Sequence, residues 1–286
     1  MDYSDSDALP PALEGYTSYL LARAFARART IGKAAMPPGR HPQEMSILAT
    51  LRERGPISQR RISEVLGVNR TMMVKAIDTL EHDGLVRRER DPVDRRSYAV
   101  TPTDAGMAAL GKMHTAATAG TAQITSRLDP AEHERLNELL RRLVPDTASP
   151  PAEMLRHTGF LVATTHGRLR ERAKHALAGL GLEPRQFGAL SVLADIEPTS
   201  QQRLADDLGV TGPAIVGMVD ELERTGRIER SRNPDDRRAH IVRLSTKGRT
   251  DLTAARRVIE AIQDDLAERL GSDGLAELNE LLAKIA

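Results

Sequence analysis

Apolar residues recur at helical spacing along most of the chain. Leu13, Leu20 and Ala28 belong to one such series, which predicts a long helix over residues 9–35. Similar series predict further helices over residues 42–55, 103–127, 130–144 and 153–180, from residue 184, from residue 245, and over residues 273–285. The pattern therefore predicts a mainly α-helical protein.

At two places in the chain, a glycine separates two shorter predicted helices. Ser58 is placed to cap the first helix of one pair, Gly67 makes the turn, and Asn69 begins a second helix that runs to about residue 83. Ser200 and Thr211 hold the same N-cap positions in the second pair. Two short helices joined by a glycine turn are typical of a helix-turn-helix, in which the second helix is the recognition helix.

A period-two pattern follows each of these helix pairs. Residues 85–90 and 97–100 predict two short strands, with Pro92 and Asp94 in the loop between them. A second hairpin is predicted near residues 227–244. Each helix-turn-helix is therefore expected to carry a small β-hairpin, or wing.

The two halves of the chain are copies of one another. A shift of 142 residues aligns residues 42–106 with 184–248 without a gap, and 23 of these 65 pairs are identical. We therefore predict one domain over residues 9–144, a proline-rich linker over 145–152, and a second domain over 153–286. Because the linker is short, the end of the first domain should lie near the start of the second.

Composition narrows the functional classes. The chain has no Cys, which excludes disulfides, thiolate metal sites and cysteine-based catalysis. It has no phosphate-binding glycine loop and no recognisable catalytic triad, so we do not expect an enzyme. No apolar run approaches the length of a membrane span, and the acidic first eight residues are unlike a secretion signal, so we expect a cytoplasmic protein without membrane partners.

The motifs of both copies resemble the MarR family of winged-helix transcription factors. The resemblance rests on Leu66-Gly67-Val68, on the Asp78, Leu80-Glu81 and Gly84 series, on Asp94-Arg95-Arg96, and on their counterparts between residues 208 and 248. It implies two winged helices whose N- and C-terminal helices interlock. Because both copies lie in one chain, this interlocking would form an intramolecular pseudo-dimer.

The resemblance also implies which wing residues meet DNA. Arg96 and Arg238 match the family arginine that enters the minor groove from the wing tip, where the negative potential favours a guanidinium. Asp94 and Asp236 would orient that arginine, and Arg95 and Arg237 complete the two tips. The alternative is a solvated charged turn, because proline and aspartate are common in turns.

The recognition helices differ more than the wings do. The outward positions of the first helix are Asn69, Arg70, Thr71, Val74 and Lys75, which suit bases and phosphates. The matching positions of the second helix carry no charge: Thr211, Gly212, Pro213, Val216 and Gly217. Residues 52–96 have 11 basic and 8 acidic side chains, a net charge of +3, whereas residues 194–238 have 7 and 10, a net charge of −3. We therefore expect the first domain to bind DNA more tightly.

The sequence gives weaker evidence for a small-molecule ligand than for DNA binding. MarR-like proteins often bind small aromatic anions beside the interlocked helices, and the resemblance places Tyr16, Tyr19, Phe25, Phe160 and His166 near such a cleft. Core packing or surface exposure is the favoured alternative for each of these residues. His157, His166 and His175 are nine residues apart, which does not place them on neighbouring turns, so we expect no metal and no cofactor.

The sequence thus predicts a DNA-binding regulator, expected to repress, that reads a pseudo-palindromic operator with two unequal winged helices. Release by a small aromatic or anionic ligand is the associated expectation, and a monomer is the expected state in solution. The alternative is an interaction or ligand-sensing protein in which the second domain has lost DNA binding and docks a partner.

Overall fold

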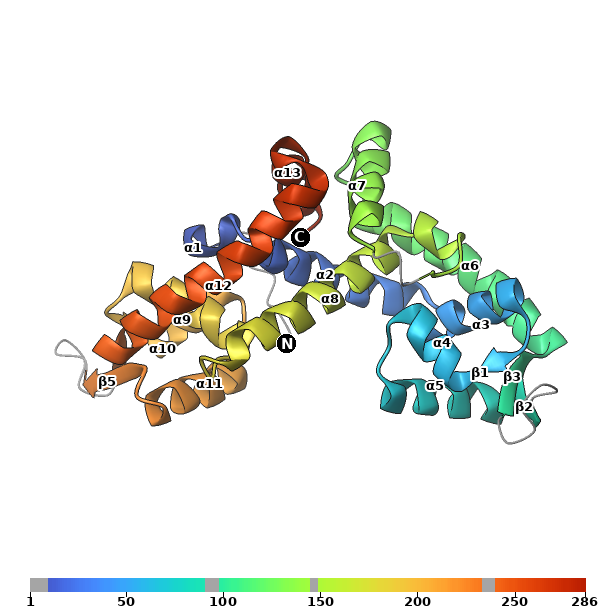
Figure 1. Ribbon diagram of the computed structural model, residues 1–286, viewed down its shortest axis with the longest axis horizontal. Helices are drawn as coiled ribbons and strands as arrows, with labels where there is room; N and C mark the ends of the chain where they lie inside the picture. The colour runs from blue at the N-terminus through green and yellow to red at the C-terminus, as the bar shows by residue number, and fades with distance from the viewer. Residues whose placement is uncertain (1–9, 91–97, 145–148, 233–239) are drawn as a thin grey trace. The chain divides into compact units, whose positions relative to one another are not determined.

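The computed structural model describes residues 10–90, 98–144, 149–232 and 240–286 (Figure 1). Most of these residues are helical, as the apolar spacing predicts. The helices are α1 (Pro11–Glu14), α2 (Thr17–Ala35), α3 (Pro42–Arg54), α4 (Gln59–Leu66), α5 (Arg70–His82), α6 (Asp104–Ile124), α7 (Pro130–Leu143), α8 (Thr158–Ala178), α9 (Pro184–Ile196), α10 (Gln201–Leu208), α11 (Gly212–Arg224), α12 (Thr246–Leu270) and α13 (Ser272–Ile285), with a 3-10 turn, η1, at Met154–Arg156.

The two wing hairpins are confirmed, and each has an additional short strand. The strands β2 (Val86–Arg90) and β3 (Tyr98–Pro102) are antiparallel, and β1 (Ile57–Ser58) pairs with β3 on its other edge. The second sheet repeats this order with β4 (Thr199–Ser200), β6 (His240–Leu244) and β5 (Ile228–Arg232). The strands β1 and β4 were not predicted, because two residues are too few to show a period-two pattern.

Two helices that were predicted to be continuous are interrupted near their N-terminal ends. The helix predicted over residues 9–35 ends at Glu14 and resumes at Thr17, and the helix predicted over 153–180 becomes the turn η1 followed by α8 from Thr158. A tertiary hydrogen bond fixes each restart. The Thr17 hydroxyl donates to Asn279 Oδ1 at 2.7 Å, and the Thr158 hydroxyl donates to Asn137 Oδ1 at 2.9 Å.

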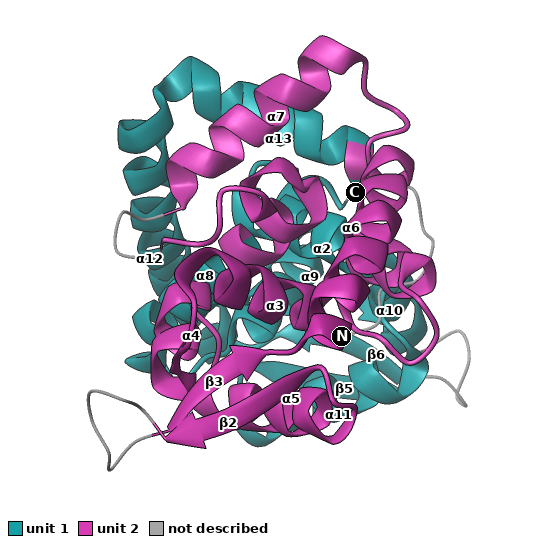
Figure 2. Cartoon of the chain, turned by 90° about the vertical axis from the view of Figure 1, so that its right-hand side faces the viewer, with its two compact units in different colours: residues 1–26, 166–284, 286 teal, residues 27–165, 285 magenta. Residues whose placement is uncertain are grey.

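The chain divides into two compact units that exchange their N-terminal segments (Figure 2). Unit 2 comprises residues 27–165 and 285, so it holds the first winged helix together with the start of α8. Unit 1 comprises residues 1–26, 166–284 and 286, so it holds the second winged helix together with α1 and the start of α2. Each winged helix therefore packs with the leading segment of the other repeat, which confirms the predicted internal pseudo-dimer.

The leading segments are held by specific contacts within each unit. In unit 1, the rings of Tyr16 and Phe187 meet edge to face with centroids 5.4 Å apart, and Gln263 donates a 2.9 Å hydrogen bond to the carbonyl oxygen of Gly15. In unit 2, Arg141 donates to the carbonyl oxygen of Leu155 at 3.1 Å. The domain limits 9–144 and 153–286 describe the sequence repeats and stay a prediction.

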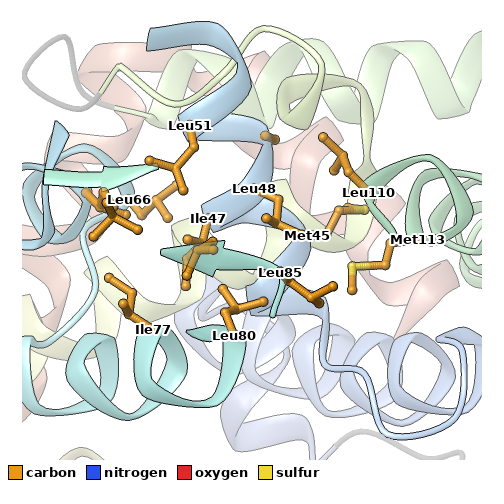
Figure 3. Packing of buried hydrophobic residues seen from close by; sticks show 14 of the residues in the cluster. Met45, Ile47, Leu48, Leu51, Leu66, Ile77, Leu80, Leu85, Leu110 and Met113 are labelled. Atoms are coloured by element: carbon orange, nitrogen blue, oxygen red, sulfur yellow. The ribbon is translucent and has the colours of Figure 1, made fainter. Parts of the chain in front are cut away.

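The core of unit 2 consists of aliphatic and methionine side chains. Leu48, Ile77, Leu80 and Met113 are fully buried within one cluster that joins α3, α5 and α6 (Figure 3). Met154 of η1 is also part of this cluster. The leading segment of the second repeat therefore contributes to the core beneath the first winged helix.

Candidate nucleic-acid interface

The first helix-turn-helix is formed by the predicted cap and turn residues. The Ser58 side chain accepts a hydrogen bond from the Arg61 amide, and Gly67 adopts the left-handed conformation with φ 64°. The Asn69 side chain accepts from the Thr71 amide at 2.8 Å and caps α5. These residues set the direction in which the recognition helix leaves the turn.

Helix α5 has one buried face and one exposed face. Met73, Ile77 and Leu80 are completely buried against the core. The predicted reading residues, Asn69, Arg70, Thr71, Val74 and Lys75, are all exposed. The structure therefore places these five side chains at the surface of the N-terminal half of the helix, which is the part of a recognition helix that meets base edges.

The second helix-turn-helix has the same cap and turn positions, but the N-terminus of its recognition helix differs. The Ser200 side chain caps α10, Gly209 has φ 64°, and Thr211 occupies the N-cap position of α11. Against expectation, the Thr211 side chain makes no capping hydrogen bond. Pro213 has no N–H to donate, and the Ala214 amide donates to the Thr211 backbone carbonyl instead.

The five predicted reading positions of α11 carry no charge. Thr211, Gly212, Pro213, Val216 and Gly217 are all exposed. A Cβ added at Gly212 or Gly217 would meet no atom within 4 Å, so neither glycine is required by packing. At these five positions the helix can offer apolar contact but no cationic contact to phosphate.

The predicted wing-tip residues, Asp94, Arg95, Arg96, Asp236, Arg237 and Arg238, lie outside the described residues. The structure does describe the base of each wing. Arg88 of β2 donates to Asp78 Oδ1 at 2.5 Å, to Glu81, and to Gln59 Oε1 at 3.2 Å. One guanidinium therefore ties the wing to both α4 and α5.

The same connection is present in the second winged helix. Arg230 of β5 pairs with Asp220 and, at 3.3 Å, with Glu223 of α11. Burial alone would lower the pKa of Arg88, but its hydrogen bonds to Asp78 and Glu81 outweigh this effect and raise its pKa. The link that Arg88 forms between wing and recognition helix became apparent only in the structure.

The predicted ligand residues are divided between the two units. In unit 1, the rings of Phe25 and His166 stack with centroids 4.7 Å apart, and burial followed by the charge of Arg170 lowers the pKa of His166 to about 4. Tyr19 is half-buried in the same unit, and burial raises its pKa. Phe160 belongs to unit 2, where it packs against the aliphatic core.

A histidine pair that the sequence did not indicate lies in unit 2. His114 Nδ1 and His157 Nε2 are 3.3 Å apart, and burial followed by the charge of His114 lowers the pKa of His157 to about 4.

Within the described ranges, no three His, Asp or Glu side chains are grouped so that they could hold a metal ion. Across the same residues, no helix is long and apolar enough to span a membrane.

Comparison with known proteins identifies both repeats. The sequence pattern of the MarR family matches residues 41–98 and again residues 182–240. A Thauera aromatica protein whose description links it to transcriptional regulation of the hcr operon is 30% identical over 132 residues, which cover 46% of this chain and 76% of that protein. The uncharacterized HTH-type transcriptional regulator YkoM of Bacillus subtilis (strain 168) is 32% identical over 127 residues, which cover 43% of this chain and 82% of that protein.

Solved structures of two transcriptional regulators are each similar to less than half of this chain. The transcriptional repressor CouR bound to a 23-mer DNA duplex is 36% identical, covers 44% of this chain and 90% of its own, and gives a TM-score of 0.43. A mutant MarR from E. coli complexed with operator DNA is 26% identical, covers 44% and 91%, and gives a TM-score of 0.42. With its two matched repeats and its two curated relatives, the chain belongs to the MarR family of non-enzymatic, DNA-binding transcriptional regulators.

Proposed function

We propose that this chain is a repressor that reads an imperfect palindrome in double-stranded DNA with its two winged helices. The observation that carries the proposal is the pair of exposed recognition-helix faces, on α5 and α11, within one chain and in one sequence register. A family member with a single such domain needs a second subunit to supply the second face. Here the exchange of leading segments between units 1 and 2 takes the place of that dimerisation.

The two halves of the operator should be unequal. Arg70 and Lys75 are exposed on α5, whereas Gly212 and Gly217 hold these positions on α11. The net charges of the surrounding segments, +3 for residues 52–96 and −3 for 194–238, differ in the same sense. Because attraction to phosphate dominates nonspecific affinity, the first winged helix is the stronger anchor.

The chain acts as a monomer in this proposal. Two recognition helices that address successive major grooves on one face of DNA are ~34–36 Å apart, so a single chain would cover one operator. A dimer of chains would instead present four recognition helices. The residues assigned to DNA contact are the wing residues 94–96 and 236–238 together with the exposed residues of α5 and α11.

A selection experiment tests the function directly. The purified full chain is incubated with random duplexes, bound DNA is sequenced, and light scattering gives the mass of the free and bound protein. We expect one chain per duplex and a selected site with one strongly defined half and one degenerate half. If no sequence is enriched, the proposal of a sequence-specific regulator is refuted. If both halves of the selected site are equally well defined, the proposed difference between the two winged helices is refuted.

Release by a small aromatic or anionic compound is the second part of the proposal. The stacked pair of Phe25 and His166 in unit 1 offers an aromatic surface beside a half-buried imidazole. The probe is benzoate, titrated into the preformed complex with the selected duplex and monitored by fluorescence anisotropy. Dissociation that is weakened in Phe25→Leu supports this site, whereas dissociation that is unchanged in Phe25→Leu refutes it.

The uncharged reading positions of α11 favour one alternative, in which the second winged helix has lost DNA binding and docks a partner. The two functions predict different selected sites. A docking domain leaves a single half-site with no sequence preference at the position of the other half. Changes in α11 would then leave the affinity for DNA unaltered.

A further inference from the structure

The recognition helices α5 and α11 share one side chain in their first two turns. When residues 69–77 are aligned with 211–219, the only identical pair is Val74 and Val216. Both are exposed, Val74 by 41% and Val216 by 45%. The two copies have therefore diverged at every neighbouring position while each has kept an exposed, branched apolar side chain at this one.

The other shared side chains of the exposed surface have a structural role. Asp78 and Asp220, one turn further along, are hydrogen-bonded to the wing arginines Arg88 and Arg230. Glu81 and Glu223 pair with the same two arginines. These acidic residues hold the wing against the helix, which accounts for their presence in both copies.

Neither the helix nor the core accounts for the two valines. A β-branched residue loses side-chain freedom in a helix, so an exposed valine is a poorer helix former than alanine. The buried face is already supplied by Met73 and Ile77 in α5, and by Ile215 and Val219 in α11. An exposed valine in both recognition helices therefore points to a contact outside the chain.

We propose that Val74 and Val216 each contact the C5-methyl group of a thymine in the major groove. This inference rests on the proposed function and names one base in each half-site. The N-terminal half of a recognition helix meets base edges, and thymine alone among the four bases presents a methyl group there. Because both valines hold the same register, the two thymines lie at matching positions of the two half-sites.

The positions next to the two valines do not offer a contact that both helices could make. Lys75 is matched by Gly217, and Thr71 by Pro213, so hydrogen-bond contacts from these two positions of the first helix have no counterpart in the second. Met72 is 57% exposed and is matched by Ala214, which adds apolar surface to the first helix alone. The shared thymine is therefore the symmetric element of an otherwise asymmetric operator.

Uracil scanning of the selected duplex tests this assignment. Each thymine is replaced in turn by deoxyuridine, which keeps every base-pairing group and removes only the methyl. We expect one thymine in each half-site at which the replacement weakens binding about 4-fold, the factor that corresponds to ~0.8 kcal/mol for one buried carbon group. Replacement at thymines outside the contacts should leave the affinity unaltered.

Val74→Ala and Val216→Ala complete a double-mutant cycle. Each variant should weaken binding to the thymine duplex and lose the uracil effect in its own half-site, while the uracil effect in the other half-site persists. Alanine is the better helix former, so far-UV circular dichroism should show unchanged helix content.

The outcomes separate this inference from the function on which it rests. Specific binding with no uracil-sensitive thymine, or a uracil effect that survives in both alanine variants, would overturn the valine contacts and leave the regulator intact. Failure to select any duplex would overturn the regulator and, with it, the valine contacts. A uracil effect in only one half-site would overturn the matched pair.

Discussion

The guanidinium of Arg88 lies 2.5 Å from Oδ1 of Asp78, and the chain repeats this ion pair 142 residues later between Arg230 and Asp220. Each pair joins the first strand of a wing to the exposed side of a recognition helix. The base of each wing is therefore tied to the recognition helix of the same winged helix. Minor-groove and major-groove contacts would be coupled by this link.

Removal of Arg88 should loosen the wing and destabilise the fold. Arg88→Ala leaves Asp78 and Glu81 without their shared partner, and we expect the free energy of unfolding to fall by about 1 kcal/mol. Urea denaturation followed by circular dichroism measures the change. Arg87→Ala is the matched control, because Arg87 pairs with Glu89 on the surface, where an ion pair contributes little. Equal losses in both variants would argue against the link.

A close approach between helix and wing should make Gly106 irreplaceable. A Cβ at Gly106 would lie 2.0 Å from the carbonyl oxygen of Leu85, and Gly248 stands in the same relation to Arg227. We expect Gly106→Ala to destabilise the chain by about 3 kcal/mol or more, because the backbone itself must shift. Gly111→Ala, in the same helix with nothing within 4 Å, should be neutral or stabilising by up to ~1 kcal/mol. A thermal melt of the two variants compares them, and a tolerated Gly106→Ala would be inconsistent with this packing.

The lowered pKa of His157 predicts a loss of stability in mild acid. Burial, and then the charge of His114, lowers this pKa to about 4 from an ordinary value of 6.5. As the pH falls below 6.5, the unfolded chain takes up a proton that the folded chain does not bind until about pH 4. The contribution to stability is therefore complete above pH 6.5 and is lost between pH 6.5 and 4. His157→Gln should flatten the pH dependence of urea unfolding over this window, and an unchanged slope would contradict the buried neutral state.

A lysine on the second recognition helix should strengthen DNA binding. Gly217→Lys reproduces Lys75 at the matching position of α11, where there is open space. We expect higher affinity for the selected duplex and a steeper salt dependence, by about 0.9 in the logarithmic slope for one added phosphate contact. Gly111→Lys adds the same charge on α6 and controls for net charge. An equal gain from both variants would show that position on α11 does not matter.

The regular parts of this fold were predictable because they repeat. A local signal such as the glycine turn at Gly67 gained weight from its copy at Gly209, and the 142-residue register aligned the caps, turns and wings of both copies. The interlocking of the repeats was implied by the family resemblance. The exposure of Val74 and Val216 followed from helical periodicity. Their proposed contact with DNA became apparent only when the structure showed that the nearby Asp78 and Asp220 are bonded to the wing arginines.

Contacts between distant residues were not predictable. Thr17 and Asn279 are 262 positions apart, and nothing in either local sequence shows that they are bonded. The interruptions before α2 and α8 depend on such bonds, so local spacing predicted unbroken helices. The absence of a side-chain cap at Thr211 depends on Pro213, whose missing N–H was visible in the sequence but was outweighed by the usual preference of threonine for N-caps.

The central claim is that one chain carries two DNA-reading winged helices of unequal strength. The most direct test is the affinity of Arg96→Ala and Arg238→Ala for the selected duplex, measured by fluorescence anisotropy at fixed salt. Both residues are predicted wing-tip residues outside the described ranges, and both are expected to contact the minor groove. We predict that both substitutions weaken binding and that Arg96→Ala weakens it more. Loss of binding in Arg238→Ala with retention in Arg96→Ala would contradict the claim.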